Sequence, residues 1–347
     1  MLYILAKNAF FVKRILVFFV YLFYTTAMDE KKYLRNYYDS KDSGKAFIFA
    51  MLALFAVTIV ATIVALSVAN IIGVDYNEVT TSLPFVICNA FCGPIAFVST
   101  YLIYSKCSKI SFKAINLNFR MGYKNTLLCI AVAFIALFGL QFYIGGVDEI
   151  LRLIGYNVND GLLGLPLDNV GWLFLNMFLY AFLPAIAEEI IFRGVILQGL
   201  RKNMSDSISI LISAALFALM HCNLQQLVFP MLIGLILGWI ATRTGSLLSS
   251  IIVHFVNNSI TIFLAFIAII TQKDVFRLDY SLWWVWVIAI VLVLVTFAIF
   301  YLIDKFYFKH KNQKELTKTD VNNMPPLIIW IALGVGLIMF ILFTILH

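Results

Sequence analysis

The chain contains long apolar runs that charged residues seldom interrupt, such as VGWLFLNMFLYAFLPAIA at residues 170–187. Runs of roughly 20 apolar residues are long enough to cross a bilayer as helices. Lipid offers no hydrogen-bond partners, so a backbone inside it must satisfy its own polar groups, and an α-helix does this. The composition agrees, because 63% of the residues are hydrophobic and 12% are charged, against about 25% charged in soluble chains. We therefore predict an all-α fold, a polytopic transmembrane helical bundle.

The apolar runs mark about eight to nine spans by length and hydrophobicity. Their bounds are roughly 46–72, 83–104, 127–145, 170–190, 207–221, 225–242, 247–271, 281–303 and 327–346. A shorter apolar stretch at residues 14–27 is a signal-like segment, a membrane-surface helix or an additional span. One hypothesis is that translation starts naturally at Met28, where a polar stretch begins.

Lysine and arginine concentrate in alternate connecting segments. Residues 28–45, 105–126 and 304–326 are rich in them, whereas residues 73–82 contain none. The positive-inside rule places the three basic segments in the cytoplasm and the C-terminus outside. The net charge of +7 is scattered over several short loops, so it indicates topology and not a nucleic-acid partner. We expect an integral, multi-pass protein of a bacterial plasma membrane.

Ionisable side chains inside a membrane are costly, so they are candidates for function. The first cluster, EEIIFR, contains Glu188, Glu189 and Arg193. Glu189 and Arg193 are four residues apart on one helix face and can pair. Glu188 is turned about 100° away from its neighbour and is free to face another partner. The competing interpretation is that the helix leaves the membrane here and the charges are interfacial.

Two further clusters carry histidine. FALMH ends with His221, and HFVNN places His254 and Asn258 on one helix face. Taken alone, each is more typical of a structural hydrogen bond between helices. However, Glu188 and His221 lie roughly 21 Å, and His254 roughly 15 Å, along their helices from segments assigned to the cytoplasmic side. The three groups can therefore meet at one depth, which interfacial charges would not explain.

Together these residues resemble the motifs of the CAAX protease and bacteriocin-processing (CPBP, or Abi) family. The matching motifs, in chain order, are Glu188-Glu189-x-x-x-Arg193, Phe217-x-x-x-His221 and His254-x-x-x-Asn258. Pro184 before the glutamates and RTGSLLSSIIVHF before the last motif also fit. The resemblance covers about residues 170–262, and the flanking spans match only as generic membrane helices.

The resemblance implies an intramembrane endopeptidase that acts on a membrane-anchored or membrane-embedded peptide or protein. By position, Glu188 would be the general base that activates water, and His221 would assist that water. His254 and Asn258 would stabilise the oxyanion or complete a metal site. The remaining residues of the first motif would support this geometry.

Two mechanisms stay open for such an enzyme. Glu188, His221 and His254 would form a two-histidine, one-carboxylate zinc site. No HExxH motif is present, and Asn258 is a poor zinc ligand but a good hydrogen-bond donor. We therefore expect that no cofactor is required, with zinc as the alternative.

We divide the chain at the limits of the resemblance. Residues 1–45 form an N-terminal segment, 46–169 the N-terminal spans, 170–262 the protease-like core, and 263–347 the C-terminal spans. A non-catalytic immunity or scaffold protein on the same fold is one alternative function, and a proton- or ion-coupled transporter is another. A bacterial origin would favour peptide processing or bacteriocin self-immunity over CAAX substrates.

Overall fold

The computed structural model shows a helical membrane protein. It describes residues 35–115, 117, 121–158, 165–272, 282–308 and 324–346. These residues are helical apart from their connections, and no strand occurs among them. The all-α prediction is confirmed. The apolar stretch at residues 14–27 and the hypothesis about Met28 lie outside the described residues, and the division into four segments stays a prediction.

Six helical stretches of the described chain are long and apolar enough to cross a membrane. They are Ser40–Ile72, Leu83–Cys107, Tyr123–Leu153, Val170–Asn203, Leu247–Thr271 and Trp283–Phe308. Shorter apolar helices cover Asp206–Met220, Val228–Thr244 and Leu327–Leu342. Six long and three shorter helices agree with the prediction of a polytopic bundle of about eight to nine spans.

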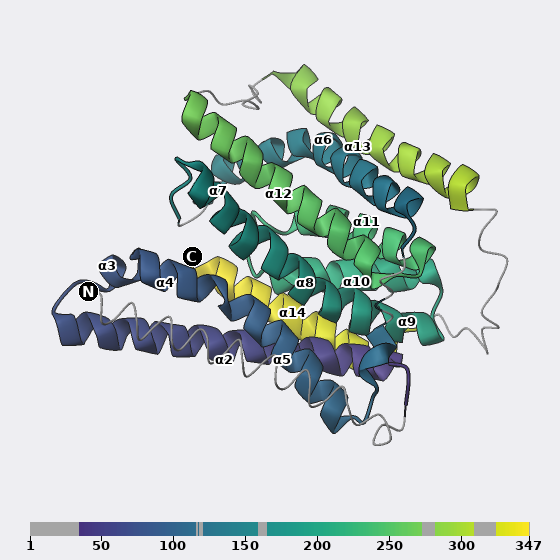
Figure 1. Ribbon diagram of the computed structural model, residues 1–347, viewed down its shortest axis with the longest axis horizontal. Coiled ribbons are helices and arrows are strands. Elements are labelled where there is room, and N and C mark those ends of the chain that lie inside the picture. Colours follow the sequence, from purple (N-terminus) through teal and green to yellow (C-terminus); the bar gives the residue numbers. More distant parts are fainter. Residues whose placement is uncertain are drawn as a thin grey trace.

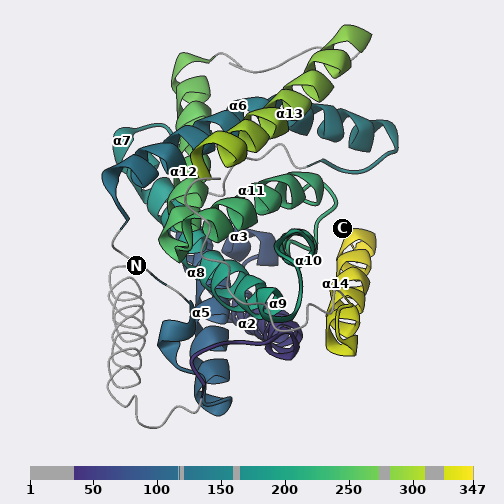
Figure 2. The same ribbon diagram turned by 90° about the vertical axis from the view of Figure 1, so that its right-hand side faces the viewer.

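The helices lie in three groups (Figure 1, Figure 2). On one side α6 (Tyr123–Leu153) contacts α12 (Leu247–Thr271) and α13 (Trp283–Ile303). On the other side α2 (Ser40–Ile72) contacts α5 (Cys92–Cys107) and α14 (Leu327–Leu346).

The stretch Val170–Asn203 and the two shorter helices after it occupy the middle of the bundle (Figure 1). Of these two, α10 (Asp206–Met220) packs against α14, and α11 (Val228–Thr244) packs against α12.

The helix that carries the glutamates extends beyond the expected membrane span. We expected a span of about 170–190 on a helix that ends near residue 202, and the structure ends it at Asn203, after α7 (Val170–Asn176), η3 (Met177–Phe182), α8 (Leu183–Glu189), η4 (Ile190–Leu197) and α9 (Gln198–Asn203). The competing interpretation placed the charges where the helix leaves the bilayer. In the structure Glu189 and Arg193 are buried within the bundle, because both have fully inaccessible side chains.

The second span is interrupted. The structure divides it at Phe91 into α4 (Leu83–Ala90) and α5. Pro94, in the first turn of α5, has no N–H to donate to the carbonyl four residues earlier, so a continuous helix would lose a hydrogen bond there.

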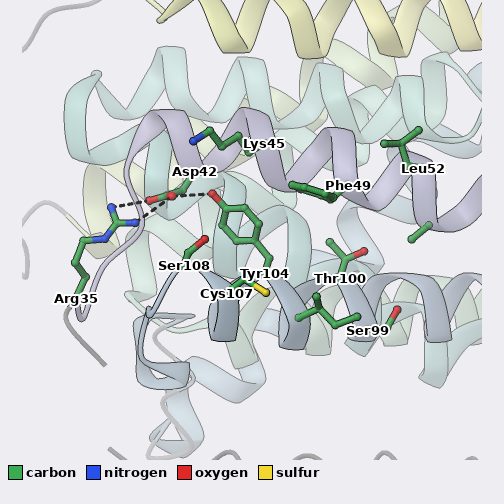
Figure 3. A pocket seen from close by; sticks show the side chains of 12 residues that line it. Arg35, Asp42, Lys45, Phe49, Leu52, Ser99, Thr100, Tyr104, Cys107 and Ser108 are labelled. Carbon is green, nitrogen blue, oxygen red and sulfur yellow. Dashed lines mark hydrogen bonds and ion pairs between the residues drawn. The ribbon is translucent and has the colours of Figure 1, made fainter. Parts of the chain in front are cut away.

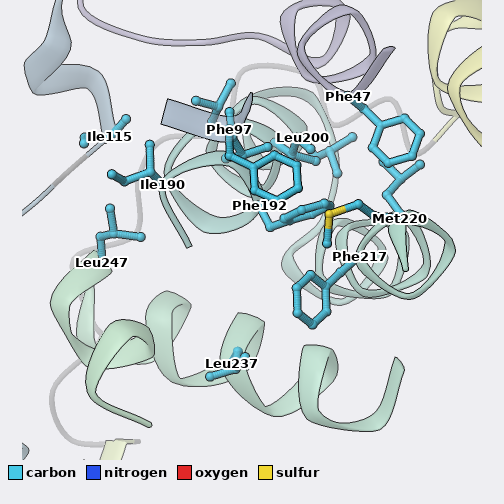
Figure 4. Close-up of a cluster of buried hydrophobic side chains, with 14 of the residues drawn as sticks. Phe47, Phe97, Ile115, Ile190, Phe192, Leu200, Phe217, Met220, Leu237 and Leu247 are labelled. Carbon is cyan, nitrogen blue, oxygen red and sulfur yellow. The ribbon is translucent and has the colours of Figure 1, made fainter. Parts of the chain in front are cut away.

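The buried core lies around the central stretch. Phe192 of η4 is fully buried and packs edge-on against Phe217 of α10, with ring centroids 5.0 Å apart (Figure 4). Phe47 of α2 and Phe97 of α5 contact the same ring at 6.5 and 6.4 Å. These aromatic contacts connect η4 to three other helices, so the segment after the glutamates is held in place by apolar packing.

Candidate active site

The two glutamates lie between two π-helical segments, η3 and η4. A π-helical turn bonds each N–H to the carbonyl five residues earlier, as the Leu183 N–H does to the Phe178 carbonyl. Pro184 follows directly and has no N–H, so it cannot donate to the carbonyl of Tyr180. Such turns are rare and are frequent at functional sites. Proline thus changes the helical geometry just before Glu188.

Glu189 and Arg193 form the ion pair expected from their spacing. Arg193 Nη1 donates to Glu189 Oε1 at 2.8 Å, and neither side chain is exposed. A buried charge without a partner is strongly destabilising, so each of the two requires the other. Removal of either partner alone would therefore destabilise the bundle.

Arg193 also joins the neighbouring helices. Its Nη2 donates to the backbone carbonyl of Gly234 on α11 at 3.1 Å. Its guanidinium carbon lies 4.6 Å from the ring centre of Phe217 on α10, within the range of a cation–π contact. A side chain at Gly234 would meet Ala214 at 3.1 Å, so glycine allows α11 to approach α10 closely here. One arginine thus connects η4 to both shorter helices.

His254 on α12 lies between the two carboxylates. Its Nδ1 is 3.0 Å from Glu189 Oε1, within hydrogen-bond range, and its Nε2 is 3.9 Å from Glu188 Oε2. A carboxylate oxygen accepts, so Nδ1–H is the donor. The His254 side chain is 6% exposed and that of Glu188 is 16% exposed. Glu189 therefore fixes the ring and directs its other nitrogen towards Glu188.

His221 follows the last residue of α10 and lies against the same aromatic ring. Its Nδ1 is 2.9 Å from the Phe217 carbonyl. A carbonyl only accepts, so Nδ1 carries the proton and Nε2 is left for another partner. The Phe217 ring centroid is 5.1 Å from that of His221 and 6.0 Å from that of His254, nearly perpendicular to both. Phe217 is thus the common wall between the two histidines.

Asn258 lies one turn beyond His254 on α12. Its Nδ2 is 3.5 Å from the carbonyl oxygen of Tyr180 on η3. In a regular α-helix this carbonyl would accept from the N–H of residue 184, but Pro184 has no N–H. This long contact joins α12 to the π-helical turn before the glutamates. The amide carries two N–H groups, so one such contact does not use its full capacity.

A metal site at these residues stays an open alternative. Among the described side chains, no group of three or more histidine, cysteine, aspartate or glutamate residues is arranged to hold a metal ion. Glu188 is near His254, and the Nδ1 atoms of His254 and His221 are engaged by Glu189 and by the Phe217 carbonyl. Histidines that bind zinc through Nε2 usually donate Nδ1–H in this way, so the hydrogen bonds do not decide between the two mechanisms, and we derive no step through a metal.

A pocket lined by Glu188, His221, His254 and Asn258 stays a prediction. A hollow of about 750 Å³ lies between α2 and α5 (Figure 3), and none of these four residues lines it.

The spacing of the three motifs did not reveal every contact at the site. The Gly234 carbonyl was missed, because it comes from a helix without a motif. The Tyr180 carbonyl was missed too, although Pro184 four residues later is a signal that it lacks a helical donor. Phe217 was recognised only as part of a motif, and its contacts with Arg193, His221 and His254 were not foreseen.

The fold and the site together define a multi-pass membrane protein with a buried carboxylate–histidine cluster. Residues 170–260 match a family model described as type II CAAX prenyl endopeptidase Rce1-like. The match begins with the helix that carries Glu188 and ends two residues after Asn258, so the resemblance stated from the motifs is confirmed for this region. No curated protein matches the chain, and no solved structure matches it either.

Proposed function

We propose that the protein is an intramembrane endopeptidase in which Glu188 activates a water molecule. The contact between Glu188 and His254 carries this proposal. Glu188 Oε2 and His254 Nε2 are 3.9 Å apart, too far for a direct hydrogen bond but close enough for one water to contact both. The Rce1-like match over residues 170–260 supports the assignment to a peptidase.

The reaction begins with proton transfer from that water to Glu188. The oxygen of the water attacks the peptide carbonyl carbon, and the carbonyl oxygen becomes an oxyanion. Glu188 then delivers the proton to the amide nitrogen, the C–N bond breaks, and the products are a carboxylic acid and an amine. A positioned general base typically contributes about 10²- to 10⁴-fold to the rate.

The other residues of the cluster stabilise this sequence. His254 and Asn258 are the proposed donors to the oxyanion, which is the usual role of donors fixed in a site that excludes water. Because Nδ1–H is donated to Glu189, His254 donates through Nε2 in its doubly protonated form, whereas Asn258 donates through its amide. His221 orients the attacking water through Nε2. Glu189 holds His254, and Arg193 pairs with Glu189.

The substrate is proposed to be a peptide or protein anchored in the membrane. The helices that carry Glu188 and His254 are long and apolar enough to cross the bilayer, so a substrate held at the membrane would reach the site without leaving the lipid. Holding the scissile bond near the site also lowers the entropic part of the barrier.

The test is cleavage by the full-length protein in liposomes, with a panel of peptides that carry a lipid or helical anchor. We expect new peptide termini by mass spectrometry and, in ¹⁸O-labelled water, one labelled oxygen in the new carboxyl group. Absence of cleavage across the panel, together with a Glu188-dependent ion flux into the liposomes, would contradict the proposal and favour the transporter alternative.

A further inference from the structure

The carboxylate of Glu189 has one oxygen that the contacts described above leave unused. Oε1 accepts from Arg193 at 2.8 Å and lies 3.0 Å from His254 Nδ1. Oε2 is buried and has no hydrogen-bond partner among the described residues. A buried polar atom without a partner costs free energy, and the cost is larger on a charged group. A donor for Oε2 is therefore expected close to the cluster.

Ser250 on α12 is the candidate for this donor. It lies four residues before His254, so the two side chains are on the same face of the helix. It is fully buried and lies close enough to the Glu189 carboxylate for a hydrogen bond between the two side chains. The face of α12 that holds the histidine ring therefore also brings a hydroxyl to the glutamate.

The hydrogen of the Ser250 hydroxyl has two acceptors within reach. Its Oγ is 2.9 Å from the backbone carbonyl oxygen of Leu247, and a hydroxyl has one hydrogen to donate. In an α-helix that carbonyl accepts from the N–H four residues later, so it is satisfied without the serine. Hydrogen bonds to an ionised acceptor are roughly twice as strong as those between neutral groups. Rotation of the hydroxyl towards Glu189 Oε2 is therefore favoured.

Ser249, the preceding residue, has a different environment. It is also fully buried, but its Oγ lies 2.6 Å from Thr244 Oγ1 and 2.7 Å from the Ser246 carbonyl oxygen. These contacts lie in the turn between α11 and α12 and do not involve the glutamates. The two neighbouring serines therefore allow a hydroxyl at the cluster to be compared with one that holds a turn.

We infer that Ser250 is a positioning residue of the proposed peptidase, and that its hydroxyl donates to Glu189 Oε2. With this bond Glu189 has a donor on each oxygen, so its carboxylate is fixed against rotation. Oε1 then stays directed at His254 Nδ1, and the ring keeps Nε2 towards Glu188. Ser250 acts through Glu189 and His254 and does not contact the substrate. Its effect on cleavage rests on the proposed function, whereas the hydrogen bond itself does not.

The first experiment compares cleavage of a membrane-anchored peptide in liposomes by the full-length wild type, Ser250→Ala, Ser250→Thr and Ser249→Ala. We expect Ser250→Ala to lower kcat about tenfold, because a small displacement of catalytic groups lowers the rate. KM should stay unchanged, because the serine does not contact the substrate. Ser250→Thr keeps the hydroxyl and should restore most of the rate. Ser249→Ala should cleave like wild type, with a melting temperature similar to that of Ser250→Ala.

The second experiment does not require cleavage. The protein contains four histidines, so ¹⁵N labelling of histidine gives few NMR signals, and His254→Gln identifies the Nδ1–H signal of His254. When Glu189 loses one donor, its charge is shared among fewer hydrogen bonds, and the remaining bonds strengthen. We expect this proton signal to move downfield in Ser250→Ala, to return towards its wild-type position in Ser250→Thr and to be unchanged in Ser249→Ala.

An unchanged His254 signal in Ser250→Ala would overturn the inference, because the serine would then not donate to Glu189. If the wild type cleaves the peptide, equal kcat values for Ser250→Ala and Ser249→Ala would also overturn it, because the bond would have no effect on the reaction. If the wild type does not cleave but the signal moves in Ser250→Ala, the proposed function fails and the hydrogen bond between Ser250 and Glu189 is supported. The two failures are therefore distinguishable.

Discussion

Glu188 and Glu189 are neighbours in the chain, but their side chains occupy different environments. Glu189 is fully buried and accepts from both Arg193 and His254 through Oε1. Glu188 is 16% exposed, and its described polar neighbour is the Nε2 of His254 at 3.9 Å. The helical turn of about 100° between adjacent residues separates the two carboxylates. One carboxylate is therefore structural, and the other is available for chemistry.

The structural role of Glu189 predicts a loss of stability. Glu189→Gln leaves Arg193 charged and buried without its partner, which typically costs about 3–5 kcal/mol. We expect a clearly lower melting temperature in detergent. The double variant Glu189→Leu with Arg193→Met removes both charges and should be more stable than Glu189→Gln.

The matched control is the ion pair of Arg201 and Asp206, which are 18% and 32% exposed. Asp206→Asn should cost no more than about 1 kcal/mol, as for other partly exposed pairs. Similar melting temperatures for Glu189→Gln and Asp206→Asn would show that the buried pair does not stabilise the bundle.

Helical spacing was sufficient to predict contacts within one helix. The interval of four residues predicted the Glu189–Arg193 pair, and the offset of one residue predicted that Glu188 would face elsewhere. Contacts between helices depend on how the helices pack against each other, and the spacing of residues along the sequence does not determine this packing. The bond from His254 to Glu189, for example, joins residues 65 positions apart.

The burial of the charges on the fourth span could be foreseen only in part. A glutamate pair and an arginine are also consistent with a helix that is leaving the bilayer. Here Glu189 is neutralised by Arg193 on the same helix, and Arg193 is also bonded to the Gly234 carbonyl. Partners on the same and a neighbouring helix allow the charges to remain buried, and only the Glu189–Arg193 contact could be foreseen.

Phe217 is predicted to position the two histidines and Arg193. Phe217→Leu removes the ring that contacts all three, and a small displacement of catalytic groups can lower a rate by up to about 100-fold. We expect the rate of peptide cleavage to fall by roughly 10- to 100-fold. The stability loss should be below the roughly 3–5 kcal/mol of a truncation to alanine.

Phe97→Leu is the control for this substitution. Phe97 is 3% exposed and also packs against Phe192, but none of its described ring contacts involves a histidine. Melting temperatures of the two variants should be similar, and the cleavage rate of Phe97→Leu should be close to wild type. An equal loss of activity in both would assign the effect of Phe217 to general core packing.

Metal removal should not inactivate the enzyme. Asn258 is a good hydrogen-bond donor but a poor zinc ligand, and the proposed mechanism uses Glu188 and His254 directly. Purified protein dialysed exhaustively against a chelator should therefore retain its cleavage rate and contain no stoichiometric zinc by elemental analysis. Loss of activity that zinc alone restores would return Glu188, His221 and His254 to the role of ligands.

The most direct measurement is the rate at which wild type and Glu188→Gln cleave the same membrane-anchored peptide in liposomes. The substitution keeps the shape of the side chain and removes its basicity, so the rate should fall by about 10²- to 10⁴-fold at an unchanged melting temperature. A cleavage rate of Glu188→Gln within a few-fold of wild type would contradict the assignment of Glu188 as the base that activates water.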